Sequence, residues 1–171
     1  MTKKLTFLFI LAYLFLLKAC GQTSEKAYHA MLKTLYSNSV PVITPQVLKQ
    51  KLDNGKQELI LLDTRTEREY TVSHLPNATY IGYDDFNLNQ LHHLPKNTPL
   101  IVYCSVGYRS EKVGEKLKKA GYTNVYNLYG GLFEWVNKGY TITNAKGPTT
   151  KVHAYSQAWG IWLNKGEKVY E

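Results

Sequence analysis

Residues 100–110, which read LIVYCSVGYRS, leave little freedom in how the middle of this chain can fold. They begin as an uninterrupted apolar run, which is typical of a parallel strand covered on both faces. The run passes through a cysteine and a glycine-containing loop into residues 111–120, where apolar side chains recur at helical spacing. Gly121 follows at the position where a helix commonly ends. The sequence therefore predicts a buried strand, a tight loop and an amphipathic helix.

A cysteine, Cys104, lies where this strand meets the loop. A loop between a strand and a helix N-terminus can turn several backbone N–H groups toward one point, and the helix dipole favours negative charge there. Such a site favours the thiolate form of a cysteine, which is the nucleophilic form. Open α/β folds also place their sites at the carboxyl ends of their strands. We therefore predict a nucleophilic cysteine in an anion-binding loop. The competing interpretation is a buried structural cysteine that ends the strand.

The overall composition points to a globular protein with no marked preference for nucleic acid. The 171 residues are 44% hydrophobic and 20% charged, and the formal net charge is +8. Lys3, Lys4 and Lys18 supply three of these charges, and subtracting them leaves +5. The other lysines are scattered or lie on the predicted helix face, where solvent explains them. Because the sequence contains no CxxC or HExxH spacing, we predict no metal site, and nothing in it calls for a cofactor.

The first twenty residues have the pattern of an export signal. A basic start is followed by residues 5–17, which are almost all apolar. Thirteen helical residues reach about 20 Å, less than the roughly 30 Å hydrocarbon core of a bilayer, which favours a secretory signal over a membrane span. Leu17-Lys18-Ala19-Cys20 resembles a bacterial lipobox, although Lys18 departs from the usual small residue.

The lipobox resemblance implies cleavage before Cys20 and lipidation of its thiol. We therefore expect residues 1–19 to be a signal peptide. The protein would be an exported, membrane-anchored lipoprotein of a bacterial cell envelope, facing the periplasm. An ordinary cleaved signal and an uncleaved anchor remain as alternatives.

Strands and helices alternate through the remaining sequence, which is typical of a parallel sheet covered by helices. After a tether and short helix over 20–38, we expect one α/β domain over 39–142. Its predicted strands cover residues 40–43, 59–62, 79–81, 100–104 and 124–128, with a short helix within 83–94. Residues 143–171 are an aromatic tail. It either packs on the domain and buries both of its tryptophans, or offers a partner surface beside the site.

Four blocks, in their order and spacing, resemble the single-domain rhodaneses. Residues 63–65, DTR, resemble the family's Asp-x-Arg, and residues 70–78, YTVSHLPNA, resemble its aromatic-x3-His-aliphatic-Pro-Gly-Ala signature. In the second block Asn77 replaces a glycine, and asparagine is the non-glycine residue that best tolerates positive φ. Residues 104–110, CSVGYRS, resemble the active loop C-x-x-G-x-R-S. The resemblance extends over about residues 40–139, and its closing block comprises Gly121-Tyr122, Leu128, Gly130-Gly131 and Trp135.

The resemblance implies a rhodanese-like three-layer α/β/α fold around a mainly parallel sheet of about five strands. It also implies a sulfurtransferase, in which the Cys104 thiolate takes sulfane sulfur from a donor such as thiosulfate and passes it from a persulfide to a thiophilic acceptor. The implied partners are small sulfur-containing anions or protein persulfides. The implied substrate-binding loop is Ser105, Val106, Gly107, Tyr108 and Arg109. Arg109 has two possible roles, as a fixed positive charge or as a brace for the loop.

The length of this loop distinguishes sulfur chemistry from phosphate chemistry. Cys104 and Arg109 bound a Cys-x4-Arg loop of six residues, whereas phosphatases on a similar fold have Cys-x5-Arg and space for a phosphate. The loop also lacks an evident carboxylate for a phosphatase general acid. Two other functions remain open. One is an exported persulfide carrier or thiol redox protein, and the other is a rhodanese-fold binding module with little catalysis.

Four further residues are expected to support the site. Asp63 and Arg65 are interpreted as an internal charge pair rather than as catalytic groups. His74 is expected to satisfy the backbone of a turn rather than act as a base. Ser110 lies at the start of the helix that follows the loop.

Overall fold

The computed structural model describes residues 24–55 and 58–170 of the chain. The chain divides into two compact units, residues 1–35 and 36–171. In the first unit the described part is a helix over residues 24–35, which agrees with the short helix expected there. The predicted signal peptide and Cys20 lie outside the described residues. Within the described ranges, no helix combines the length and the apolar character needed to cross a bilayer.

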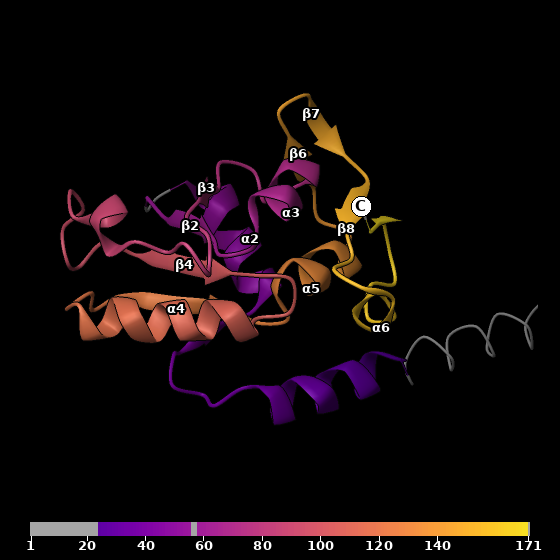
Figure 1. Cartoon of the computed structure of the whole chain (residues 1–171), viewed down its shortest axis with the longest axis horizontal. Helices are drawn as coiled ribbons and strands as arrows, with labels where there is room; N and C mark the ends of the chain where they lie inside the picture. The colour runs from indigo at the N-terminus through magenta and orange to yellow at the C-terminus, as the bar shows by residue number, and fades with distance from the viewer. Residues whose placement is uncertain (1–23, 56–57, 171) are drawn as a thin grey trace, which may run out of the picture. The chain divides into compact units, whose positions relative to one another are not determined.

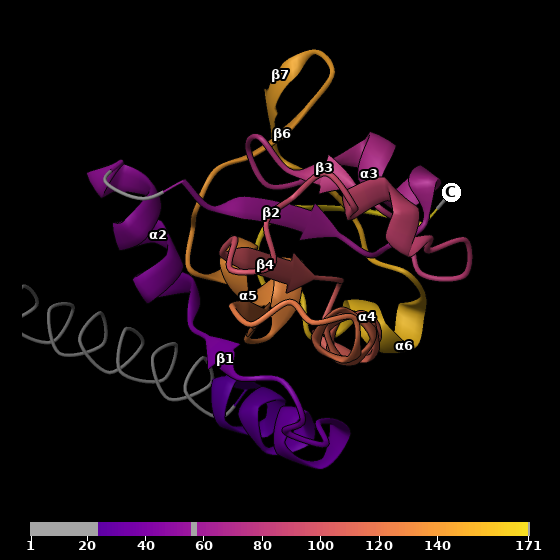
Figure 2. The same cartoon turned by 90° about the vertical axis from the view of Figure 1, so that its left-hand side faces the viewer.

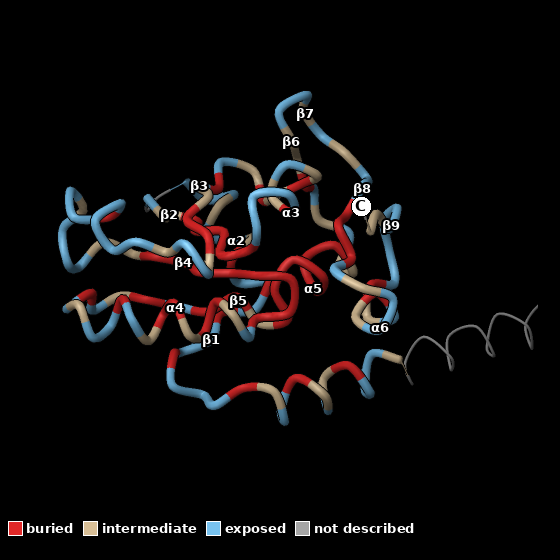
Figure 3. The backbone as a smooth tube through the Cα atoms, viewed as in Figure 1, coloured by how far each residue is buried: buried red, intermediate tan, exposed pale blue. Residues whose placement is uncertain are grey.

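The second unit is built on a five-stranded parallel sheet (Figure 1). The strand order is β1-β5-β4-β2-β3, and every neighbouring pair is parallel. The predicted fold class is thereby confirmed. All four residues of the central strand β4 are buried (Figure 3), because this strand is covered on both faces. The strands are β1 (Val42–Ile43), β2 (Ile60–Asp63), β3 (Thr79–Tyr80), β4 (Leu100–Tyr103) and β5 (Val125–Leu128).

Helices connect the strands. The step from β1 to β2 and the step from β4 to β5 run in opposite directions along the sheet. Since crossovers between parallel strands are right-handed, their helices α2 and α4 lie on opposite faces (Figure 2). The helices of this part are α2 (Pro45–Asn54), α3 (Glu67–Val72), α4 (Tyr108–Lys119) and α5 (Gly131–Asn137).

Local sequence sets where these helices begin. Thr44 caps α2 and accepts a hydrogen bond from the Val47 N–H, as the Thr-Pro pair predicts. Thr66 and Glu69 form a reciprocal capping box at the start of α3. The helix expected within residues 83–94 is reduced to one 3-10 turn, η1 (Leu88–Leu91). The side chain of Asn87 caps that turn.

The C-terminal segment belongs to the second unit and is richer in short strands than expected. An antiparallel hairpin, β6 (Ile142–Asn144) and β7 (Gly147–Thr149), is followed by the parallel pair β8 (Lys151–His153) and β9 (Glu167–Val169). Between β8 and β9 lies the short helix α6 (Gln157–Gly160).

The expectation that both tryptophans of this segment are buried is wrong. Trp159 and Trp162 are only half-buried. The buried contact is made instead by smaller side chains, those of Val152, Ala154 and Leu163.

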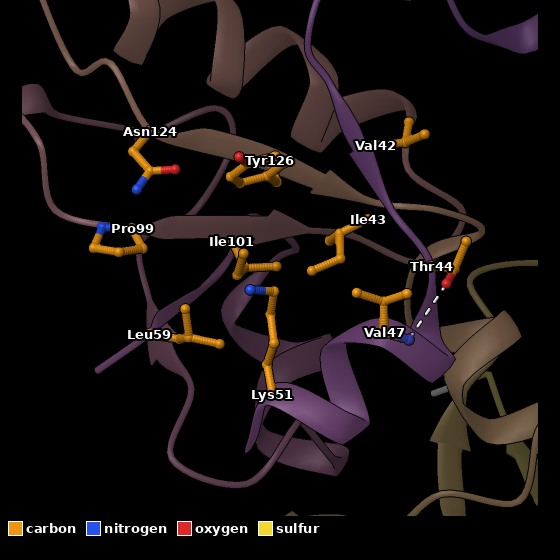
Figure 4. A pocket seen from close by; sticks show the side chains of 10 residues that line it. All are labelled: Val42, Ile43, Thr44, Val47, Lys51, Leu59, Pro99, Ile101, Asn124 and Tyr126. Carbon is orange, nitrogen blue, oxygen red and sulfur yellow. Dashed lines mark hydrogen bonds between the residues drawn. The ribbon is translucent and has the colours of Figure 1, made fainter. Parts of the chain in front are cut away.

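A pocket of about 350 Å³ lies between α2 and one face of the sheet, toward the amino ends of β2, β4 and β5 (Figure 4). Leu59, Pro99 and Asn124 lie immediately before β2, β4 and β5, so the pocket is at the sheet edge opposite the one that bears Cys104. It is therefore separate from the predicted site. Its lining comprises Val42, Ile43, Thr44, Val47, Lys51, Leu59, Pro99, Ile101, Asn124 and Tyr126.

A fully buried ion pair lies at the carboxyl end of β2. The side chains of Asp63 and Arg65 are both 0% exposed, with Arg65 Nη2 2.7 Å from Asp63 Oδ2. Arg65 also donates to the Ser73 carbonyl at 2.5 Å, which joins the end of β2 to the end of α3. Burial lowers the pKa of Arg65, but the Asp63 charge outweighs it, so the pKa lies above its usual range. The internal charge pair is thus present, and it links two of the segments that surround the site.

We expect Asp63→Asn to lower the free energy of unfolding by about 3–5 kcal/mol, because it leaves the Arg65 guanidinium buried without a counter-charge. Urea denaturation measures the change. The control is Asp53→Asn, which removes an exposed partner of Lys49 on α2 and should cost less than about 1 kcal/mol. Equal losses in the two variants would contradict a special role for the buried pair.

Candidate active site

Cys104 directly follows β4 and is 1% exposed. Asp63 at the end of β2 pairs in register with Tyr103, so the sulfur lies beside the ends of two central strands. The loop from Cys104 then enters α4 at Tyr108. The predicted loop residues are thus brought together at the carboxyl edge of the sheet, where parallel α/β folds place their sites.

The first two carbonyls of the loop are held by the start of α5. The N–H of Leu132 donates to the Cys104 carbonyl at 2.8 Å, and the N–H of Phe133 donates to the Ser105 carbonyl at 3.0 Å. This close approach requires Gly131, because a Cβ at that position would lie 2.3 Å from the Cys104 carbonyl oxygen. The glycine pair before α5 therefore serves the active loop directly.

The next two carbonyls are held by residues from other parts of the chain. The Tyr36 hydroxyl donates to the Val106 carbonyl at 2.6 Å, and Asn127 Nδ2 donates to the Gly107 carbonyl at 2.9 Å. Asn127 is itself oriented by the Ser110 hydroxyl, which donates to its Oδ1 at 2.7 Å. Ser110 thus contacts the loop indirectly, through Asn127 of β5.

Because all four carbonyls of residues 104–107 are bound from outside the loop, its peptide N–H groups are free to turn inward. The Gly107 N–H points to Cys104 Sγ at 3.1 Å. Gly107 has φ +104°, a conformation that side chains rarely adopt. The helix α4 begins without a side-chain cap, and the first N–H groups of any helix lack intrahelical partners. Backbone N–H groups in such a position can stabilise an anion, so this geometry suits the anion-binding role predicted for the loop.

Arg109 braces the loop through a carboxylate that the sequence did not single out. Its Nη1 and Nη2 lie 2.8 Å from the two oxygens of Glu69 on α3, a bidentate pair. The Ser105 hydroxyl donates to Glu69 Oε1 at 2.8 Å, and Arg109 Nη2 reaches that hydroxyl oxygen at 3.2 Å. Glu69 is therefore committed to the loop rather than to a metal ion. Of the two roles left open for Arg109, the structure shows the brace.

The charges in this cluster are strongly coupled. Burial raises the pKa of Glu69, but hydrogen bonds and charge from Arg109, with the charge of Arg65, outweigh burial and lower it from 4.5 to about 2. Burial lowers the pKa of Arg109, but the hydrogen bond of Glu69 and the charges of Cys104 and Glu69 keep it above its usual range. Both groups are therefore ionised at neutral pH, and the positive charge beside the thiol is largely neutralised.

His74 is engaged within its turn, as expected. Its Nδ1 lies 2.9 Å from the Tyr70 carbonyl, and its ring stacks on the Tyr70 ring at 3.9 Å. Its backbone pairs with Thr143 of β6 in an isolated bridge. In the same turn Asn77 has φ +61°, so the asparagine adopts the conformation for which the family uses glycine.

The C-terminal segment also reaches the site, through a residue that the sequence did not single out. The Tyr155 ring centroid lies 5.3 Å from the Arg109 guanidinium carbon, a cation–π contact. Tyr155 is half exposed and has φ +66°, and its N–H donates to His153 Nδ1 at 3.1 Å. Burial lowers the pKa of His153 below its usual value, so its ring is neutral. Arg109 is thus held by Glu69 and covered by Tyr155.

Among all these contacts, the Glu69–Arg109 pair gives a testable dependence of stability on pH. Because the pKa of Glu69 is lower in the folded protein than its ordinary 4.5, the ionised carboxylate stabilises the folded state at neutral pH. The contribution is roughly 3 kcal/mol, and it disappears as the pH falls from about 5 to about 2. We expect Glu69→Gln to be less stable than the parent at pH 7, with a difference that shrinks toward pH 2. Urea denaturation across this range is the measurement.

The matched control is Glu67→Gln, which alters an exposed carboxylate on the same helix. It should leave the pH dependence close to that of the parent. A Glu69→Gln variant whose deficit stays constant from pH 7 to pH 2 would refute the assignment.

The comparison with protein families agrees with this geometry. The rhodanese-like domain family matches residues 44–138, more than half of the chain. The chain belongs to the rhodanese-like domain family. Tyr36 and Tyr155, which both contact the active loop or its arginine, lie outside the matched residues.

The curated proteins that resemble this rhodanese-like chain are named for different functions. It is 30% identical over 102 residues to the putative sulfur carrier protein YrkF of Bacillus subtilis, covering 60% of this chain and 54% of that protein. It is 34% identical to a phytoplasma tRNA uridine(34) hydroxylase, and the match covers 74% of this chain and 42% of that protein. It is 33% identical to the probable adenylyltransferase/sulfurtransferase MoeZ of Mycobacterium tuberculosis, and the match covers 70% of this chain and 29% of that protein. The chain thus spans about half or less of the length of these relatives.

Among solved structures, the rhodanese-like domain of the Anabaena protein Alr3790 superposes with a TM-score of 0.57 at 26% identity. The match covers 61% of this chain and 79% of that one. The shared fold and the family match place the chain among rhodanese-like domains.

Proposed function

We propose that this rhodanese-like protein is a sulfurtransferase that moves sulfane sulfur from a donor such as thiosulfate to a thiophilic acceptor through a persulfide on Cys104. The observation that carries the proposal is the arrangement of the loop. Its four carbonyls are bound from outside, and the Gly107 N–H donates to Cys104 Sγ at 3.1 Å. A thiolate or a terminal persulfide sulfur in this loop is stabilised by fixed N–H dipoles.

The reaction divides into two displacements. The Cys104 thiolate attacks the outer sulfur of thiosulfate, the S–S bond of the donor breaks, and sulfite leaves with the bonding electron pair. The enzyme then holds a Cys104 persulfide. An acceptor such as cyanide attacks its terminal sulfur, thiocyanate forms, and the electron pair of the broken bond returns to the Cys104 thiolate. Each step exchanges one S–S or C–S bond for another and needs no external oxidant.

The charge pattern suggests how a dianionic donor is attracted. Glu69 neutralises Arg109 across a bidentate pair, so the N–H groups of the loop and of α4 supply most of the attraction. Ser105 and Val106 add no formal charge, and Tyr108 contributes an exposed ring. This arrangement suits a small anion that donates sulfur.

The name of the relative YrkF favours a second function, a sulfur carrier that receives persulfide sulfur from a partner protein. In a dithiol redox protein a second cysteine would resolve the oxidised thiol, but Cys104 is the single cysteine of the described residues. Transferase and carrier share the Cys104 persulfide and differ in how fast thiosulfate loads it and cyanide unloads it.

We expect intact-mass spectrometry of the protein incubated with thiosulfate to show the gain of one sulfur, and we expect Cys104→Ser to show none. Transfer from thiosulfate to cyanide should vanish in Cys104→Ser, because the nucleophile is missing. The control is Cys20→Ser, which removes the other cysteine of the chain and should retain the sulfur gain. Retention of most turnover by Cys104→Ser would rule out the covalent route. A sulfur gain without steady turnover would favour the carrier.

We also propose that the protein is exported and held to a membrane through lipid on Cys20. The support is the leader alone, with its basic start, its short apolar stretch and Cys20 after Ala19. Lipidation adds roughly 0.8 kcal/mol of membrane binding per buried CH₂.

We expect Cys20→Ser to release the protein from the membrane fraction of its host, because the thiol that would carry the lipid is missing. Immunoblotting of fractionated cells measures this release. Cys104→Ser is the control and should remain with the membranes. Identical fractionation of the parent and Cys20→Ser would rule out the lipid anchor.

A further inference from the structure

Residues 36–40, here called the strap, run along α4 before the first strand. The N–H groups of Ser37 and Ser39 each donate to the carboxylate of Glu111 at 3.0 Å, and Glu111 is buried. Val40 packs where α4 has Gly114, since a Cβ on that glycine would lie 2.9 Å from a Val40 methyl. The strap is therefore fixed to the helix that follows the active loop.

The strap begins with Tyr36, whose buried hydroxyl makes two hydrogen bonds. It accepts from the Gly130 N–H at 2.9 Å and donates to the Val106 carbonyl at 2.6 Å. Burial raises the pKa of Tyr36 far above its usual value, and the nearby charge of Cys104 raises it further. The hydroxyl therefore keeps its proton at neutral pH and can act as a donor.

The bond to Val106 determines where the next N–H points. The Val106 carbonyl and the Gly107 N–H belong to one planar trans peptide unit, so they point in opposite directions. When Tyr36 fixes the carbonyl on the outside of the loop, the Gly107 N–H is directed inward to Cys104 Sγ, at 3.1 Å. Gly107 also makes room for this arrangement, because a Cβ there would lie 2.0 Å from the Tyr36 hydroxyl oxygen.

We propose that Tyr36 is a positioning residue for Cys104, which holds the Val106–Gly107 peptide so that its N–H is aimed at the reacting sulfur. The proposal deepens the proposed function and rests on it for its consequence in sulfur transfer. Tyr36 lies before the residues matched by the family, so the family match does not include it. The Gly130 N–H donates to the Tyr36 hydroxyl, which donates to the Val106 carbonyl. Hydrogen bonds in such a series strengthen one another.

The test compares Tyr36→Phe with the full-length parent in the rate of Cys104 alkylation by iodoacetamide across pH, read from the mass of the peptide that contains Cys104. Burial of the thiol limits the maximal rate, whereas the pH midpoint reports the stability of the thiolate. We expect the midpoint to rise by about half a pH unit or more in Tyr36→Phe, because the thiolate loses a well-aimed N–H. Thiosulfate–cyanide turnover should fall roughly tenfold or more.

The matched control is Tyr122→Phe. Tyr122 is another buried tyrosine, and its hydroxyl donates to the Leu91 carbonyl, away from the site. It should lose stability as Tyr36→Phe does but keep the midpoint of the parent. The parent, Tyr36→Phe and Tyr122→Phe share the same titratable groups around the thiol. These are Arg109 of α4, Glu69 of α3 and the neighbouring His153.

A second substitution keeps the test informative if Tyr36→Phe does not fold. Incorporation of 3-fluorotyrosine at position 36 alone keeps the hydroxyl and makes it a stronger donor, so the midpoint should move downward, opposite to Tyr36→Phe. A parent-like midpoint in both variants would overturn the proposal. Since alkylation needs no sulfur donor, a shifted midpoint in a protein that never gains sulfur would uphold Tyr36 and refute the transferase instead.

Discussion

The hydrogen bonds to the carbonyls of residues 104–107 are the interaction on which the rest of the site depends. A peptide unit has one acceptor and one donor on opposite sides, so binding the carbonyls from outside orients the N–H groups inward. The donors come from Leu132 and Phe133 at the start of α5, from Asn127 in β5 and from Tyr36 before the sheet. Each bond contributes about 1 kcal/mol on balance, but an unpaired buried carbonyl costs more. These bonds therefore favour one arrangement of the loop, in which the Gly107 N–H is directed at Cys104 Sγ.

Charge compensation then sets the character of the site. Asp63 balances Arg65 in a fully buried pair, and Glu69 balances Arg109 in a partly buried bidentate pair. Because neighbouring carboxylates neutralise both arginines, the arginines contribute mainly by holding segments of the chain in position. The attraction for a negative sulfur is left to backbone dipoles, which are fixed by the fold and need no side chain to reorganise.

Much of this could be predicted from the sequence. The apolar run before Cys104, the glycine at 107 and the alternation of strands and helices indicated the parallel sheet and the loop at its carboxyl edge, and the DTR block indicated the buried pair. The partners of the loop could not be predicted, because Tyr36, Glu69 and Asn127 are ordinary in their local sequence. Glu69 has the pattern of a capping-box residue, which it also is. Its second role depends on α3 and α4 meeting in space, and no local periodicity encodes that meeting. The burial of the two tail tryptophans was not predicted correctly, because in this segment Val152, Ala154 and Leu163 are the buried side chains.

The groups that hold the loop are far apart in the sequence, which affects the stage of folding at which the site forms. Tyr36 is 70 residues before Val106 and 94 residues before Gly130. Contacts this distant in sequence form late, after the entropy of closing long loops has been overcome. A chain that is still unfolded, or folded only in its local elements, carries an ordinary cysteine at position 104 without an aimed N–H. The surroundings of Cys104 are thus completed only when these distant parts of the chain have come together.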